Sequence, residues 1–256
     1  RQMCIRDSPD TIKFQFKASQ RGGNDVLEAE ELALSFGDHR LFKNVNLDIK
    51  RGEKVFLIGP NGCGKTSLLK VLLHIYKQTF GDFRFGANID IGYYDQAQGT
   101  LDESKTVIDE IWDLHPYMTQ TQVRSALAVF LFKGEDVYKP VKGLSGGERA
   151  RVLLLKLMLS KANLLILDEP TTYVDSNFEK EFYTILEELN KSLSIVMVSH
   201  DLGTICSYVK TIACVNRELH YHNSNLISAE QLQSYHCPIE LITHGKIPHL
   251  SLIHIS

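Results

Sequence analysis

The sequence lacks any apolar run long enough to cross a lipid bilayer. A spanning helix needs about 20 consecutive apolar residues, and the longest candidate, residues 152–167, is interrupted by Lys156, Lys161 and Asn163. The first eight residues, RQMCIRDS, have no apolar core of the kind that a signal peptide carries. We therefore expect a cytoplasmic protein, in which any role at a membrane would require a separate membrane partner.

Paired cysteines and excess positive charge are also lacking. The five cysteines are odd in number and scattered along the chain, which is typical of reduced thiols rather than a disulfide framework. The formal net charge is -3, so no overall positive field favours nucleic acid. Net charge does not reveal a local basic patch, so a local site for nucleic acid is still compatible with the sequence.

What the sequence does contain is a regular succession of short apolar runs and stretches of helical spacing. Hydrophobic residues make up 43% of the 256 residues, enough for one substantial core with a subdomain. Runs of four apolar residues predict buried strands at 55–58, 164–167 and 195–198. Apolar residues at helical spacing predict helices at 66–75, 148–159 and 177–189. Strands that alternate with helices predict an α/β fold with a parallel sheet.

Two stretches depart from this alternation. Apolar residues alternate with polar ones at 32–36 and 45–49, which predicts an antiparallel sheet with one solvated face. Residues 105–132 have helical spacing without intervening strands, which predicts a helical subdomain.

The strongest chemical motif is GPNGCGKT at residues 59–66, which fits the phosphate-loop pattern between a predicted strand and a predicted helix. Its glycines let backbone N–H groups wrap a phosphate at a helix N-terminus. Lys65 would place a positive charge at the β- and γ-phosphates, and the Thr66 hydroxyl would bind Mg²⁺. The flanking strand and helix argue against a chance glycine-rich turn. The residues expected to bind nucleotide here are Gly59, Asn61, Gly62, Cys63, Gly64, Lys65, Thr66 and Ser67.

A second motif, LLILDEP at residues 164–170, ends an apolar strand with two carboxylates. Ligands bind at the carboxyl ends of strands in α/β sheets. Asp168 is therefore a candidate for the Mg²⁺ shell, and Glu169 is a candidate to activate the attacking water. A solvated strand end is the alternative interpretation of this motif.

A third motif, LSGGE at residues 144–148, precedes a predicted helix. Ser145, Gly146 and Gly147 could form another anion-binding helix start, with Ser145 as N-cap and Glu148 in the first turn. A simple capped helix is the alternative. Three further residues, Phe36, Gln96 and His200, have equally simple structural interpretations when each is taken alone.

The order of these motifs along the chain resembles the ATP-binding cassette (ABC) ATPase family over about residues 26–222. The resemblance implies a RecA-like P-loop NTPase core with an antiparallel β subdomain and a helical subdomain at about 97–158, with ATP and Mg²⁺ as ligands. It implies that LSGGE contacts the ATP of an opposite domain. By the same resemblance, the adenine-stacking residue is Phe36, the D-loop residue is Asp175, the metal residues are Thr66, Gln96 and Asp168, and the catalytic residues are Lys65, Gln96, Glu169 and His200.

The kind of ABC protein is less uniform along the chain. Residues 9–167 resemble the second cassette of an ABC-F protein, in which two linked cassettes act on ribosomes, notably at VLEAEELALSFGDHRLFKNVNLDIKRGEKVFLIGPNGCGKTSLLK. Residues 168–250 resemble the ATPase subunit of a zinc or manganese ABC transporter, and TYVD at 172–175 stands where ABC-F proteins have Asn-His-Leu-Asp. A join of two sequences and a single divergent cassette both explain the change. The expected partners are a second cassette, in a homodimer or upstream on a longer chain, and either a ribosome or a membrane permease.

The boundaries expected from composition are a non-native end at 1–8, a linker at 9–25, an ATPase domain at 26–227, a tail at 228–249 and a second non-native end at 250–256. Six of the ten histidines lie at 220–254, with Cys237 beside His236. Their spacing matches no standard zinc template, so a solvated tail is favoured over a Zn²⁺ site.

Overall fold

The computed structural model describes residues 22–95, 101–172, 176–199, 211–222, 239–244 and 247–252. Within these ranges the strands form a six-stranded sheet, a three-stranded sheet and a two-stranded hairpin. The elements in chain order are β1 (Asp25–Phe36), β2 (His39–Lys50), β3 (Lys54–Ile58), α1 (Lys65–Leu72), β4 (Phe80–Phe85), β5 (Ile91–Asp95), α2 (Val107–Trp112), α3 (Gln120–Val129), the 3₁₀ turns η1 (Gly134–Tyr138) and η2 (Val141–Gly143), α4 (Gly146–Leu159), β6 (Leu164–Asp168), α5 (Ser176–Asn190), β7 (Ser194–Val198), β8 (Thr211–Asn216), β9 (Glu218–His222), β10 (Ile239–His244) and β11 (Ile247–Leu252).

The six-stranded sheet has the order β5-β6-β7-β3-β8-β9. The first five strands run parallel, and β9 returns antiparallel to β8. The predicted α/β fold with a parallel sheet is therefore confirmed. Because β7 lies between β3 and β6, the phosphate loop after β3 and the acidic end of β6 face each other across the end of one intervening strand.

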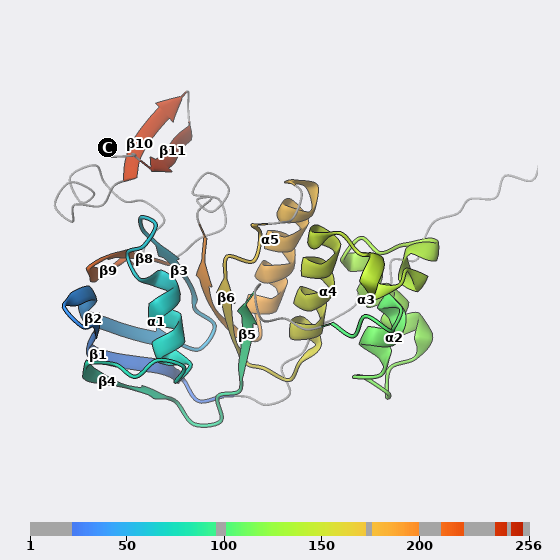
Figure 1. The fold of residues 1–256 in the computed structure, drawn as a ribbon, viewed down its shortest axis with the longest axis horizontal. Coiled ribbons are helices and arrows are strands. Elements are labelled where there is room, and N and C mark those ends of the chain that lie inside the picture. Colours follow the sequence, from blue (N-terminus) through green and yellow to red (C-terminus); the bar gives the residue numbers. More distant parts are fainter. Residues whose placement is uncertain are drawn as a thin grey trace, which may run out of the picture.

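Alternate residues of the central strands bury against two different layers. Phe56 and Ile58 of β3 belong to a core cluster that includes residues of α2, α3, α4 and α5. Val55 and Leu57 belong to a second cluster, with α1 and the inner faces of β1 and β2. This period of two is what a strand covered on both faces requires. Figure 1 shows α1 and the three-stranded sheet on one side of the central strands, and α4 and α5 on the other.

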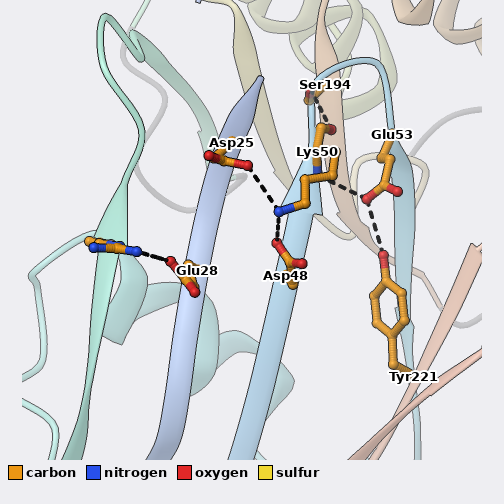
Figure 2. A network of polar contacts seen from close by, with 8 residues as sticks. Asp25, Glu28, Asp48, Lys50, Glu53, Ser194 and Tyr221 are labelled. Atoms are coloured by element: carbon orange, nitrogen blue, oxygen red, sulfur yellow. Dashed lines mark hydrogen bonds and ion pairs between the residues drawn. The ribbon is translucent and has the colours of Figure 1, made fainter. Parts of the chain in front are cut away.

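The three-stranded sheet, ordered β2-β1-β4, is antiparallel, as predicted for its first two strands. Polar contacts fasten this sheet to the central one (Figure 2). The Lys50 ammonium bridges Asp25 on β1 and Asp48 on β2. Glu53, just before β3, accepts hydrogen bonds from the Lys50 N–H at 3.0 Å and from the Tyr221 hydroxyl of β9 at 3.3 Å.

Helices α2 and α3, with both 3₁₀ turns, lie within the stretch expected to form a helical subdomain, about 97–158, and farthest from the three-stranded sheet (Figure 1). A partly buried ion pair joins α2 to α4: the Lys156 ammonium lies 2.6 Å from a Glu110 carboxylate oxygen. Glu110 is 4% exposed. In the part of the chain that the structure describes, no helix is long and apolar enough to cross a membrane.

Candidate functional site

The phosphate loop connects β3 to α1 and can be built only with glycine at its tight points. Gly59 has φ 154°, and a Cβ atom there would lie 2.1 Å from the Val215 carbonyl oxygen. Gly64, the N-cap of α1, has φ 100°, in the left-handed region that disfavours side chains. The loop therefore delivers the chain directly into the first turn of α1, where free backbone N–H groups favour an anion.

Lys65 is folded against the phosphate loop itself. Its ammonium donates hydrogen bonds to the carbonyl oxygens of Gly59 at 2.8 Å and Pro60 at 2.9 Å. Burial lowers the Lys65 pKa, while the negative charges of Glu169 and Asp168 act in the opposite direction. The thiol of Cys63 lies 4.0 Å from the ammonium and is buried among apolar residues.

Asp168 and Thr66 meet although they come from different elements. The Thr66 hydroxyl donates a 3.1 Å hydrogen bond to the Asp168 carboxylate. Burial raises the Asp168 pKa, the Thr66 hydrogen bond lowers it, and the charges of Glu169 and Asp95 raise it further. Asp95, the last residue of β5, lies opposite Asp168 in the register of the neighbouring strands β5 and β6. The carboxyl groups at the ends of β5 and β6 and the Thr66 hydroxyl therefore lie at the same end of the sheet.

Glu169 has a backbone conformation that few non-glycine residues adopt. Its φ is 50°, in the left-handed region. Its N–H donates to the Val198 carbonyl of β7 at 3.1 Å, and the Thr172 hydroxyl donates to its carbonyl at 3.1 Å. Strain of this kind clusters at functional sites and persists where surrounding contacts fix the chain.

A cavity of about 520 Å³ lies over the phosphate loop. It brings the candidate base Glu169 together with six residues expected to bind nucleotide: Asn61, Gly62, Gly64, Lys65, Thr66 and Ser67. Leu41, at the start of β2, also lines it and was not predicted. No sequence pattern pointed to Leu41, because it lies between the alternating stretches at 32–36 and 45–49. Cys63 and Gly59 do not line this cavity.

Other predicted residues lie elsewhere. Phe36 is 51% exposed and packs edge-on against Tyr76, with ring centroids 5.5 Å apart; it is not part of the cavity wall. Gln96, Asp175 and His200 lie outside the described residues.

The LSGGE motif begins α4, as predicted. Ser145 is the N-cap and forms a reciprocal capping box with Glu148: its hydroxyl accepts from the Glu148 N–H, and the Glu148 carboxylate accepts from the Ser145 N–H. Lys139 pairs with Glu148 at 3.1 Å. Ser145, Gly146 and Gly147 do not line the cavity over the phosphate loop.

A glycine-dependent phosphate loop between a buried parallel strand and a helix, facing a buried strand-end aspartate, defines a P-loop nucleotide-binding protein with a RecA-like core. A family model described as ABC transporter matches residues 42–172, about half of the chain. The chain therefore belongs to this family, and it is an ABC-type ATPase domain that binds ATP.

The relatives are of two kinds, as the sequence resemblance predicts. The ATP-binding protein YdiF of Bacillus subtilis is 44% identical over 192 residues, which are 75% of this chain and 30% of YdiF. A metal transport system ATP-binding protein of Thermotoga maritima is 33% identical over 230 residues, covering 86% of this chain and 94% of the relative. The chain thus spans about a third of the length of YdiF.

Among solved structures, a dimeric ATP-binding cassette in a post-hydrolysis state, bound to ADP and phosphate, has a TM-score of 0.63. It is 21% identical in sequence, and the match covers 77% of this chain and 98% of that structure. This likeness confirms the predicted fold class.

Proposed function

We propose that the chain binds Mg-ATP in the cavity over the phosphate loop and hydrolyses it with Glu169 as general base. One observation carries the proposal: the hydrogen bond from Thr66 to Asp168 joins the phosphate loop to the end of β6. Lys65 and Glu169 line the same cavity. A cation for phosphate, oxygen ligands for a metal and a carboxylate for water are thereby available together.

The oxygen donors fit Mg²⁺. This ion prefers hard oxygen ligands and is usually held by one or two protein groups plus substrate phosphates. Thr66 and Asp168 would hold it, and the resemblance to ABC ATPases adds Gln96, which lies outside the described residues. Burial opposes the negative charge of Asp168, and a cation beside that carboxylate would offset this cost. When bound, the ion neutralises charge on the β- and γ-phosphate oxygens.

The proposed reaction is attack of water on the γ-phosphorus. The bond to the β–γ bridging oxygen breaks, ADP leaves, and Glu169 accepts the proton of the water. Lys65 would contribute positive charge to the phosphates from the position in which the loop carbonyls hold it. The hydrogen bonds of the Glu169 main chain to Val198 and Thr172 fix the backbone from which the carboxylate extends, and a general base depends on geometry first.

We further propose a head-to-tail dimer. Ser145, Gly146 and Gly147 begin α4 outside the cavity that holds Lys65, so this helix start is available to the nucleotide of a second cassette. Ser145 and Gly146 are exposed, and the N–H groups of this first turn that have no partner within the helix could donate to a phosphate oxygen. The similar solved structure is itself a dimer.

For the biological role, we propose an ABC-F type ATPase that acts on the ribosome. The resemblance of residues 9–167 supports it, and YdiF is long enough to hold a second cassette beside the matched third. The ATP-binding subunit of a zinc or manganese transporter is the second candidate, because the Thermotoga relative is matched over 94% of its length. Sedimentation with purified ribosomes, using Glu169→Gln and ATP, would support the first role. Failure to sediment, with stimulation of the ATPase by a permease, would support the second.

The ATP site is tested by Lys65→Ala. Among the described residues, Lys65 is the one cation that lines this cavity, so ATP affinity should fall at least about tenfold, the effect of losing a charge-assisted hydrogen bond. Isothermal titration with Mg-ATP measures it. Lys191→Ala, at an exposed ion pair with Glu188, is the matched control and should bind as the unchanged chain does. Equal ATP affinity in both variants would contradict the proposal.

A further inference from the structure

A second cavity, of about 690 Å³, lies beside the cavity over the phosphate loop, and the proposed hydrolysis does not use it. Three turns form its wall: the β1–β2 turn, the phosphate loop and the single-residue turn between β8 and β9. The two cavities share Leu41, Asn61 and Gly62 in their walls. The two cavities are therefore adjacent.

The wall of the second cavity carries an excess of positive charge. Arg40, Lys43 and Arg217 line it, against one carboxylate, Asp38. Lys43 is occupied by an ion pair of 2.9 Å with Glu218, and this contact lowers the Glu218 pKa. This ion pair neutralises Glu218, the residue after Arg217. Two guanidinium groups thus face one carboxylate in this cavity.

Arg217 stands at a position where an arginine is unfavourable for the backbone. Asn216 pairs with Glu218 across the turn, so Arg217 alone reverses the chain, with φ 62°. Glycine or asparagine adopts this conformation with less strain. The Arg217 carbonyl accepts a 2.7 Å hydrogen bond from the Lys43 N–H, which ties the turn to β2. Residues kept in such conformations often serve as ligand clamps, and here the residue contributes a guanidinium to the cavity wall.

We propose that this cavity is a second oxyanion site, in which Arg40 and Arg217 bind a phosphate group separate from those on the phosphate loop. Guanidinium matches phosphate through paired N–H donors, which an ammonium cannot reproduce. The group is either free inorganic phosphate or the monoester phosphate of a nucleotide. This inference goes beyond the proposed hydrolysis and does not depend on it.

The experiment uses the full chain saturated with Mg²⁺ and a non-hydrolysable ATP analogue, so that the first cavity is filled. Inorganic phosphate and AMP are then titrated in separate calorimetric runs. At least one of them should bind, and Arg40→Ala and Arg217→Ala should each weaken that binding at least about tenfold. Tighter binding of inorganic phosphate identifies the free ion as the source, and tighter binding of AMP identifies a nucleotide. Arg217→Gly also relieves the backbone, so its loss of binding cannot be attributed to a damaged turn.

Arg84→Ala is the matched control, because Arg84 is an exposed arginine on β4 whose guanidinium pairs with Glu28. It should leave phosphate and AMP affinity unchanged. A parallel titration of Lys65→Ala without nucleotide separates this inference from the proposed ATP site, since the second cavity should still bind when the first does not. Absence of binding by both probes, or binding equal in the Arg40→Ala, Arg217→Ala and Arg84→Ala variants, would overturn the inference.

Discussion

At the scale of single residues, burial of the charged Asp168 carboxylate lowers the stability of the fold, and the proposed metal site explains why an aspartate is nevertheless present. Burial raises its pKa above the ordinary value of 3.8. The folded protein therefore binds this proton more tightly than the unfolded chain does. The stabilisation from this residue is present below pH 3.8 and is lost as the pH rises through the raised value. At neutral pH the charged carboxylate lowers the free energy of unfolding.

We therefore expect Asp168→Asn to stabilise the nucleotide-free chain at pH 7 while impairing metal-dependent ATP hydrolysis. The amide oxygen can still accept the hydrogen bond from Thr66, and the midpoint of thermal unfolding should rise by roughly 2–4 °C. The gain should shrink as the pH falls towards 4. Differential scanning calorimetry at both pH values measures it, with the exposed Asp82→Asn as control. A lower midpoint for Asp168→Asn at pH 7 would contradict this account.

At the scale of elements, the ion pair between Glu110 and Lys156 connects α2 to α4, the helix that begins at the LSGGE motif. Glu110 also accepts a hydrogen bond from the Asp102 N–H at 3.3 Å. Breaking a buried pair leaves an uncompensated charge and typically costs about 3–5 kcal/mol. Because the Lys156 side chain is 24% exposed, water can partly solvate it, and we expect a smaller cost.

Glu110→Leu alone should therefore lower the free energy of unfolding by about 2–3 kcal/mol, below the range for fully buried pairs. Glu110→Leu combined with Lys156→Met should recover most of the loss, because no unpaired charge then remains. Urea unfolding of the two single variants and the double variant measures the coupling. If the double variant is as unstable as the sum of the singles, the two residues are not coupled and the interpretation is wrong.

Local patterns predicted most elements but not the contacts between them. The runs at 55–58, 164–167 and 195–198 do form β3, β6 and β7, because four consecutive apolar residues suit a strand covered on both faces. Strand β4, FGDFRF, was not predicted, since a glycine and two charges obscure its pattern and pairing with β1 fixes its position. The burial of Glu110 depends on Lys156, which is 46 residues away. The φ of Glu169 likewise depends on β7 and Thr172, which no local pattern encodes.

At the scale of the whole molecule, the separation of the two halves of the proposed site has a direct consequence. Lys65 and Glu169 line one cavity, whereas Ser145 begins α4 outside it. A composite site therefore requires two cassettes, and the isolated chain should bind ATP yet hydrolyse it slowly. Glu169→Gln keeps the size of the side chain but removes the charge that activates water. Loss of a positioned general base typically slows a reaction by about 10²–10⁴-fold.

Binding is spared in Glu169→Gln, so ATP should remain between two chains and hold them together. We expect this variant to elute as a dimer in size-exclusion chromatography with saturating Mg-ATP, whereas the unchanged chain dimerises only transiently. Ser145→Arg, added to Glu169→Gln, should abolish the dimer, because the longer side chain would occupy the space of the γ-phosphate bound to the other cassette. If Glu169→Gln binds ATP tightly and still elutes as a monomer, the homodimer is excluded. The second half of the site must then come from a different cassette, such as one upstream on a longer chain.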